Sequence, residues 1–227
     1  MITRPEPGAG ETAARIAALG LVPLQCPVLQ IRPIAAALPP ASQVGAVLLT
    51  SGSAIQFLPS VYHATPLLAV GNATAERARR AGFTQVSSAD GDAMALAVTV
   101  RQGLDPAAGP LLLAVGRGNG AALAQALRHA GYRVFRRVVY AAVPARSLAR
   151  DSVTALHEQR VRAALFFSAE TARQFVRLAQ TAGLAAALHD VEAVAIGRPA
   201  GVALQAMPWR RIRVAARPNQ DEMLELL

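Results

Sequence analysis

Five short segments of the chain combine residue types that could bind an anion. They are TSGSA (50–54), VGNATA (70–75), VGRGNGA (115–121), FSAET (167–171) and IGRPAG (196–201). Each follows an apolar run and precedes an Ala-rich one, as in a strand–turn–helix unit. Such turns gather at the carboxyl edge of an open α/β sheet, where ligands bind. Their free backbone N–H groups and positive helix ends favour a negative ligand. The alternative for any one hydroxyl (Thr50, Ser51, Thr74 or Ser168) is that it only caps a helix.

A further candidate comes from comparing the chain with itself. Residues 2–29 run parallel to residues 113–140, and aligning Gly20 with Gly131 places Leu29 opposite Tyr140. A duplicated fold needs an apolar residue at this position, yet one copy carries a phenol. The Tyr140 hydroxyl could donate a proton to a leaving group. The equal alternative is a packed ring with its hydroxyl in water.

Composition excludes several kinds of chemistry. All 23 basic residues are Arg, so pyridoxal phosphate chemistry and a Walker A loop, which need Lys, are excluded. The four histidines are scattered and Cys26 is alone, so we expect no metal. The segment GRGNG (116–120) lacks the G-x-G-x-x-G spacing of dinucleotide-binding loops, and no G-x-S-x-G elbow of a hydrolase occurs. Asp90 and Asp92, in a Gly-rich loop, are interpreted as caps for a helix that begins at Ala93.

The net charge of +9 raises the question of a nucleic-acid partner. Arginines cluster at ERARR (76–80), RVFRR (133–137) and WRRIR (209–213), but aromatic residues are sparse and no helix-turn-helix or RNA-binding signature occurs. We therefore expect solvated basic faces and no nucleic acid. We also expect no membrane association, because no apolar run approaches the ~20 residues of a membrane helix. The lone Cys26 and the lack of a signal-peptide pattern favour a cytoplasmic protein.

Apolar runs alternating with amphipathic stretches predict an α/β fold with parallel sheets flanked by helices. The expected strands are 44–50, 67–70, 111–115, 134–140, 163–167, 191–196 and 212–216. The expected helices are 10–19, 54–58, 74–81, 93–102, 121–130, 152–159, 169–181 and 220–226. Four strand–turn–helix units recur in the same order in both halves, which predicts two similar lobes.

Two Pro-containing stretches, 30–34 and 141–147, are expected to connect the lobes. Lobe 1 is then discontinuous, with residues 1–31 and 146–227, and lobe 2 comprises residues 35–141. Proteins of this kind bind ligands in the cleft between lobes.

Taken in order, the motifs resemble those of the uroporphyrinogen-III synthase family. They are TRPEPGA (3–9), TSGSA, VGNATA, GDAMAL (91–96), VVY (138–140), FFSAETA (166–172), AIG (195–197) and ARPNQDEMLELL (216–227), and they span essentially the whole chain. The resemblance implies two lobes joined by a two-stranded linker, with the active site in the cleft. It also implies a lyase that cyclises hydroxymethylbilane, a linear tetrapyrrole with eight carboxylates, to uroporphyrinogen III with inversion of the terminal ring and loss of water, in porphyrin and heme biosynthesis.

The resemblance further implies that no cofactor is needed. It assigns Tyr140 as the acid and places the substrate on a set of loop residues: Thr3, Arg4, Thr50, Ser51, Gly71, Asn72, Thr74, Arg117, Ser168, Gly197 and Arg198. The expected partner is the upstream hydroxymethylbilane synthase, and the expected state is a monomer. Arg198-Pro199-Ala200 departs from the Thr usual in the family after AIG, and Asn219 replaces the Thr of RPT. The alternative that follows is a non-catalytic bilobed binder of an anionic tetrapyrrole-like ligand, a degenerate paralogue.

Overall fold

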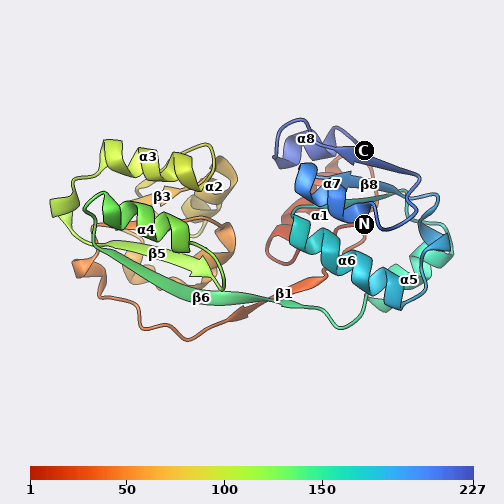
Figure 1. The fold of residues 1–227 in the computed structure, drawn as a ribbon, viewed down its shortest axis with the longest axis horizontal. Coiled ribbons are helices and arrows are strands. Elements are labelled where there is room, and N and C mark those ends of the chain that lie inside the picture. Colours follow the sequence, from red (N-terminus) through yellow and green to blue (C-terminus); the bar gives the residue numbers. More distant parts are fainter. The chain divides into compact units, whose positions relative to one another are not determined.

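The computed structural model describes residues 1–227, which form two compact units (Figure 1). Unit 1 comprises Met1–Ile31 and Val143–Leu227, and unit 2 comprises Arg32–Ala142. The chain passes from one unit to the other within two strands, β1 (Leu29–Pro33) and β6 (Val134–Pro144), which are neighbours in one sheet. None of the helices is both long and apolar enough to cross a membrane.

Unit 2 is built on a sheet with the strand order β1-β6-β5-β2-β3-β4, in which the strands from β6 to β4 pair in parallel. Its further strands are β2 (Ala46–Leu49), β3 (Leu67–Ala69), β4 (Val86–Ser88) and β5 (Leu111–Gly116). Its α-helices are α2 (Asn72–Arg80), α3 (Ala93–Gly103) and α4 (Ala121–His129), and its 3₁₀ helices are η1 (Ala41–Gln43), η2 (Gly52–Phe57), η3 (Ser60–Tyr62) and η4 (Pro106–Ala108). Every residue of β2 and β5 is buried, as expected for strands with helices on both faces.

Unit 1 has a smaller parallel sheet in the order β7-β8-β9. Its strands are β7 (Ala163–Phe166), β8 (Glu192–Ala195) and β9 (Arg211–Val214). Its helices are α1 (Gly8–Ala18), α5 (Arg150–His157), α6 (Ala169–Thr181), η5 (Ala186–Leu188), α7 (Arg198–Leu204) and α8 (Gln220–Leu224). The predicted α/β class with parallel sheets flanked by helices is confirmed.

Equivalent strand residues pair in the same way within each of the two units. Ile2 forms parallel bridges to Gln25 and to Leu165. In unit 2, Leu113 pairs in the same way with Arg136 and with Leu48. The alignment of Gly20 with Gly131 places Ile2 on Leu113 and Gln25 on Arg136. The sequence repeat therefore corresponds to equivalent pairs of strand residues.

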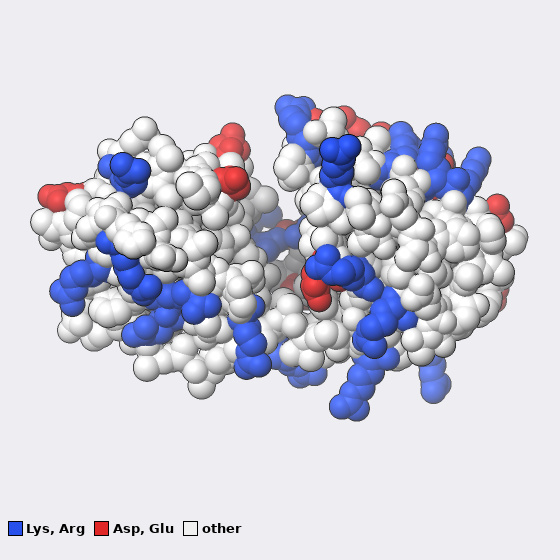
Figure 2. Space-filling view, in the orientation of Figure 1, with Lys and Arg blue, Asp and Glu red and all other residues white.

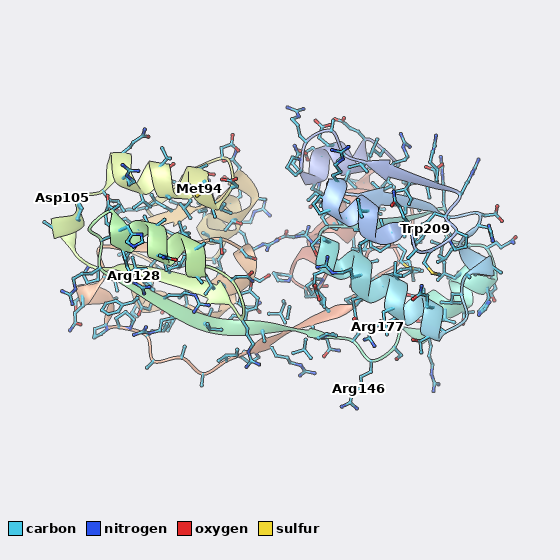
Figure 3. The ribbon with its side chains drawn as sticks, viewed as in Figure 1. Met94, Asp105, Arg128, Arg146, Arg177 and Trp209 are labelled. Carbon is cyan, nitrogen blue, oxygen red and sulfur yellow. The ribbon has the colours of Figure 1, made fainter.

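Alternate residues of each strand face different helices. In unit 1, Ile2, Leu165 and Val194 pack with α1 and α8. The next residue of β7, Phe166, faces the other way, and its ring centroid lies 5.3 Å from that of Phe175 of α6 and 5.6 Å from that of Trp209. Trp209 is labelled in Figure 3. This period of two decides which residues of a strand contact which helices.

Four elements differ from the expected strand and helix ranges. The expected helix at 54–58 is the 3₁₀ helix η2, since Pro59 disfavours the α conformation at Leu58. Helix α7 is missing from the expected helix ranges, although IGRPAG was interpreted as a turn that opens a helix. Pro199 stands in its first turn, where no intrahelical N–H bond is needed. Strands β1 and β4 are also missing from the expected strand ranges. Strand β1 overlaps the stretch 30–34, which was expected to connect the lobes, and β4 is short and partly exposed.

Candidate active site

In unit 2, the strand pairing is irregular around Tyr140, near the end of β5. Strand β6 pairs with β5 through Ala114 with Arg137 and Val115 with Val138, but Gly116 then pairs with Tyr140. Val139 is therefore the extra residue of a β-bulge. Bulges re-aim the side chains that follow them. Here the bulge places Tyr140 opposite the last residue of β5.

The Tyr140 ring lies against the backbone of Gly116. A Cβ atom at residue 116 would lie 2.7 Å from two ring carbons and 3.0 Å from the hydroxyl oxygen. Phe57 of η2 stacks on the same ring, with centroids 6.0 Å apart and planes 25° apart. The Arg117 N–H donates to the Tyr140 carbonyl over 2.8 Å. The residue is 6 % exposed, so its phenol is held by packing at the carboxyl end of β5.

The predicted loop residues of unit 2 follow the adjacent strands β2 and β3. Ser51 is half-buried and caps η2 by accepting from the Ser53 N–H at 3.3 Å. Gly71 is the N-cap of α2, and Thr74 is the third residue of that helix, with its N–H donating to the Gly71 carbonyl. Thr50 is half-buried at the end of β2. Parallel pairing of β2 with β3 and β5 therefore brings these turns to the edge that carries Tyr140.

Two other predicted residues of unit 2 are exposed. The amide of Asn72 donates to the Asp90 carboxylate over 2.6 Å, so this side chain is tied to the loop before α3. Asp92, not Asp90, is the helix cap that the sequence suggested, since it accepts from the N–H groups of Met94 and Ala95. Arg117 is exposed in the turn after β5.

In unit 1, Ser168 caps α6, whose first turn begins directly after β7. Its hydroxyl accepts from the Thr171 N–H at 3.1 Å. Gly197 is the N-cap of α7, and Arg198 is the first residue of that helix. Ala200, which stands where a hydroxyl was expected, is buried. The departure from the family pattern thus falls in a turn that still opens a helix.

Arg4 lies in a cluster of four other residues of unit 1. Its guanidinium carbon lies 4.3 Å from the centre of the Phe167 ring, a cation–π distance. Its Nη1 donates to Gln220 Oε1 over 3.2 Å and lies 3.5 Å from Thr12 Oγ1. A Cβ at Gly8 would lie 2.3 Å from Arg4 Nε, so glycine permits this arrangement. The guanidinium is fixed in position beside the turn that follows β7.

Thr3 is a predicted substrate-binding residue whose side chain is fully buried. It has no exposed surface, and its hydroxyl donates to the Leu165 carbonyl over 2.6 Å. A buried hydroxyl with a backbone acceptor has a structural role, so Thr3 does not offer its side chain to a ligand. It instead ties the N-terminal segment, and with it Arg4, to β7.

Phe57, Gly116, Phe167 and Gln220 were missed by the sequence reasoning. Phe57 occurs in the segment that follows TSGSA, and Gln220 occurs in the C-terminal motif, but nothing in their spacing indicates contact with Tyr140 or Arg4. The signal for Gly116 was available, since it ends an apolar run directly before the tight GRGNG turn.

Other features that can mark a site are clusters of charge, groups of metal-binding residues and surface hollows. On the face shown in Figure 2, arginines are spread over both units. No three His, Cys, Asp or Glu residues lie close enough together to hold a metal ion. Surface hollows of about 350 Å³ at Gln43, Gly109 and Arg133, and of about 380 Å³ between α1 and α8, lie away from the strand-end turns. The candidate site is defined by the strand ends and by the chemistry of their residues.

Comparison with known proteins gives a consistent picture. The family model described as uroporphyrinogen-III synthase HemD matches residues 10–225. The structure of uroporphyrinogen-III synthetase from Helicobacter pylori is similar with a TM-score of 0.62 and 19 % identity, covering 88 % of this chain and 89 % of that one. A mutant uroporphyrinogen III synthase from Thermus thermophilus gives a TM-score of 0.48 and 21 % identity over 99 % and 96 % of the two chains. No curated protein matches the chain.

Proposed function

The chain belongs to the uroporphyrinogen-III synthase family, and from this premise we propose how its residues carry out the reaction. The reaction cyclises hydroxymethylbilane to uroporphyrinogen III, with inversion of the terminal ring and loss of water. The enzyme is thus a cyclising lyase of heme biosynthesis. Its substrate is a linear tetrapyrrole with eight carboxylates.

The proton donor in our proposal is Tyr140. A proton from its hydroxyl reaches the terminal hydroxyl group of the substrate, the carbon–oxygen bond breaks, and water leaves. The electron pair of the pyrrole nitrogen forms a new double bond as the carbon–oxygen bond breaks, and transfer of the pyrrole N–H proton to the Tyr140 phenolate then gives a neutral azafulvene. The substituted carbon of the last ring then attacks, and fragmentation and reclosure of the spiro intermediate invert that ring. Such a leaving group needs only a well-placed weak acid.

The observation that carries this proposal is the packing around the phenol. The β-bulge at Val139, the bare backbone of Gly116 and the stacked Phe57 hold the Tyr140 ring at the strand edge where ligands of α/β proteins bind. Reactive intermediates close to the uninverted isomer when they are not guided. Fixed geometry therefore contributes more here than a strong acid would.

The carboxylates of the substrate are the second part of the proposal. In unit 2 we assign them to the turns that contain Thr50, Ser51 and Gly71, with Asn72, Thr74 and Arg117 beside them. In unit 1 we assign them to Arg4 and to the turns at Ser168, Gly197 and Arg198. The planar guanidinium of Arg4, already held on Phe167, suits a planar carboxylate. Thr3 contributes only by supporting Arg4.

We also propose that the protein is a cytoplasmic monomer without a cofactor, and that hydroxymethylbilane synthase supplies its substrate. The single Cys26 is compatible with a reducing compartment.

The altered loop at Arg198 led to the alternative of a non-catalytic binder. Because that loop still opens α7, no observation favours the alternative over catalysis.

The test is to supply hydroxymethylbilane and to separate the uroporphyrin isomers after oxidation of the products. We expect isomer III to predominate with enzyme and isomer I in buffer alone. Isomer I alone, formed at the rate seen in buffer, would overturn the proposed function.

A further inference from the structure

Phe57 is the side chain that connects the predicted substrate loop of β2 with the phenol. It is the last residue of η2, is half-buried, and its ring stacks on Tyr140 with the centroids 6.0 Å apart and the planes 25° apart. These values lie in the range of offset-stacked aromatic pairs. The two residues come from distant parts of the sequence, so only the fold brings them together.

Gly116 and Phe57 restrict the same ring in different ways. Gly116 lets the ring approach the backbone of β5, since a Cβ there would lie 2.7 Å from Cε2 and Cζ of Tyr140. Phe57 supplies the contact from η2. A ring that is confined by backbone on β5 and by an aromatic side chain has few orientations open to it. The direction of the hydroxyl is set by the same contacts.

The segment that carries Phe57 is itself well anchored. Ala54, Ile55 and Leu58 are buried, and the Leu58 N–H donates to the Ile55 carbonyl over 3.0 Å. At the other end, the Ser51 side chain caps η2, and Gly52 contacts the Arg77 side chain of α2. The position of Phe57 is therefore fixed together with that of the turn formed by residues 50–52.

We propose that Phe57 is a positioning residue that orients the Tyr140 hydroxyl for proton donation. The inference rests on the proposed function, in which Tyr140 is the acid. Phe57 itself donates no proton and carries no group that binds a carboxylate. Its loss is therefore expected to lower kcat and to leave KM nearly unchanged. Misplacing a reacting group by a small distance is enough for a large loss of rate.

The experiment compares Phe57→Leu, Phe57→Tyr and the control Phe135→Leu in the wild type and in Tyr140→Phe. Phe135 is a half-buried phenylalanine of β6 in the same unit, so the control makes the same chemical change. We expect Phe57→Leu to lower kcat about tenfold or more, with KM changed less than about twofold and the melting temperature close to that of Phe135→Leu. Phe57→Tyr keeps the aromatic ring, so its kcat is expected to stay close to that of the wild type.

The decisive comparison is the double variant. If Phe57 acts through the Tyr140 hydroxyl, Phe57→Leu lowers kcat no further once that hydroxyl is gone. The effects on kcat of two residues that act through the same group are not additive. The same proportional loss in both backgrounds, or a change confined to KM, would overturn the role of Phe57 and leave that of Tyr140 intact. If Tyr140→Phe keeps full kcat, the proposed role of Tyr140 fails, and this inference fails with it.

Discussion

The ring of Tyr140 lies directly on the backbone of Gly116, where a Cβ atom would come within 2.7 Å of two ring carbons. The contact depends on the bulge that pairs Gly116 with Tyr140 in place of Val139. Neither feature is needed to complete the sheet. Together they fix a phenol at the edge of the sheet, and this is the feature on which the proposed chemistry depends.

Gly116→Ala is the direct test of this contact. The added methyl group must displace the ring or shift the strand, so we expect kcat to fall by about tenfold or more and the free energy of unfolding to fall by about 1–3 kcal/mol. The fraction of isomer III is expected to fall as well. Gly103→Ala is the matched control, because nothing lies within 4 Å of its added Cβ. Wild-type kcat in Gly116→Ala would show that the position of the ring does not matter.

Thr3→Val tests the structural role proposed for Thr3. The variant keeps the shape of the side chain but removes the donor to the buried Leu165 carbonyl, so the protein should lose about 1–3 kcal/mol of stability. We expect kcat of the folded fraction to stay unchanged, and KM to rise only as far as Arg4 loses its support from Thr3. Denaturant unfolding measures the stability, and steady-state kinetics measure kcat and KM. A raised KM at unchanged stability would instead restore Thr3 as a substrate-binding residue.

Glu192 at the start of β8 makes stability depend on pH. Burial alone would raise the pKa of its carboxyl, but the hydrogen bond and charge of Arg211 and the charges of Arg213 and Arg210 outweigh burial, so the pKa lies below its ordinary value of 4.5. A carboxyl with a lowered pKa stabilises the folded state above its ordinary value. This stabilisation is lost as the pH falls through the folded-state pKa.

Glu192→Gln is therefore expected to lower stability by about 0.2–1 kcal/mol near neutral pH, the range of exposed ion pairs. The difference from the wild type should shrink when the pH falls below about 4.5. Melting temperatures measured from about pH 3 to about pH 7 would check this. A difference that stays constant over that range would show that Glu192 does not act through its charge.

Local pattern was enough to predict most of the fold. The helix at 169–181 was predicted at its observed bounds, because Ser168 is a good cap and the apolar residues recur at helical spacing. The alignment of Gly20 with Gly131 placed residues in equivalent strand pairs. These features depend on neighbours in the sequence, so a pattern can predict them.

The surroundings of the two central side chains could not be predicted in this way. The bulge at Val139 adds a residue without any change in the apolar pattern of VVY, and the contact of Phe57 with Tyr140 joins distant segments. Thr3 stands in a recognisable motif, but the motif does not reveal that its hydroxyl is buried against Leu165. Tertiary packing decides each of these, and it leaves no local signature.

The most direct test of the account is the turnover of Tyr140→Phe with hydroxymethylbilane, with the isomers resolved and the melting temperature measured alongside. The ring, its stack on Phe57 and its contact with Gly116 remain, so we expect the fold to be kept. Loss of the proton donor should lower kcat for isomer III by about 10²–10⁴. A kcat like that of the wild type, or a loss of activity matched by loss of the fold, would contradict the assignment of Tyr140 as the acid.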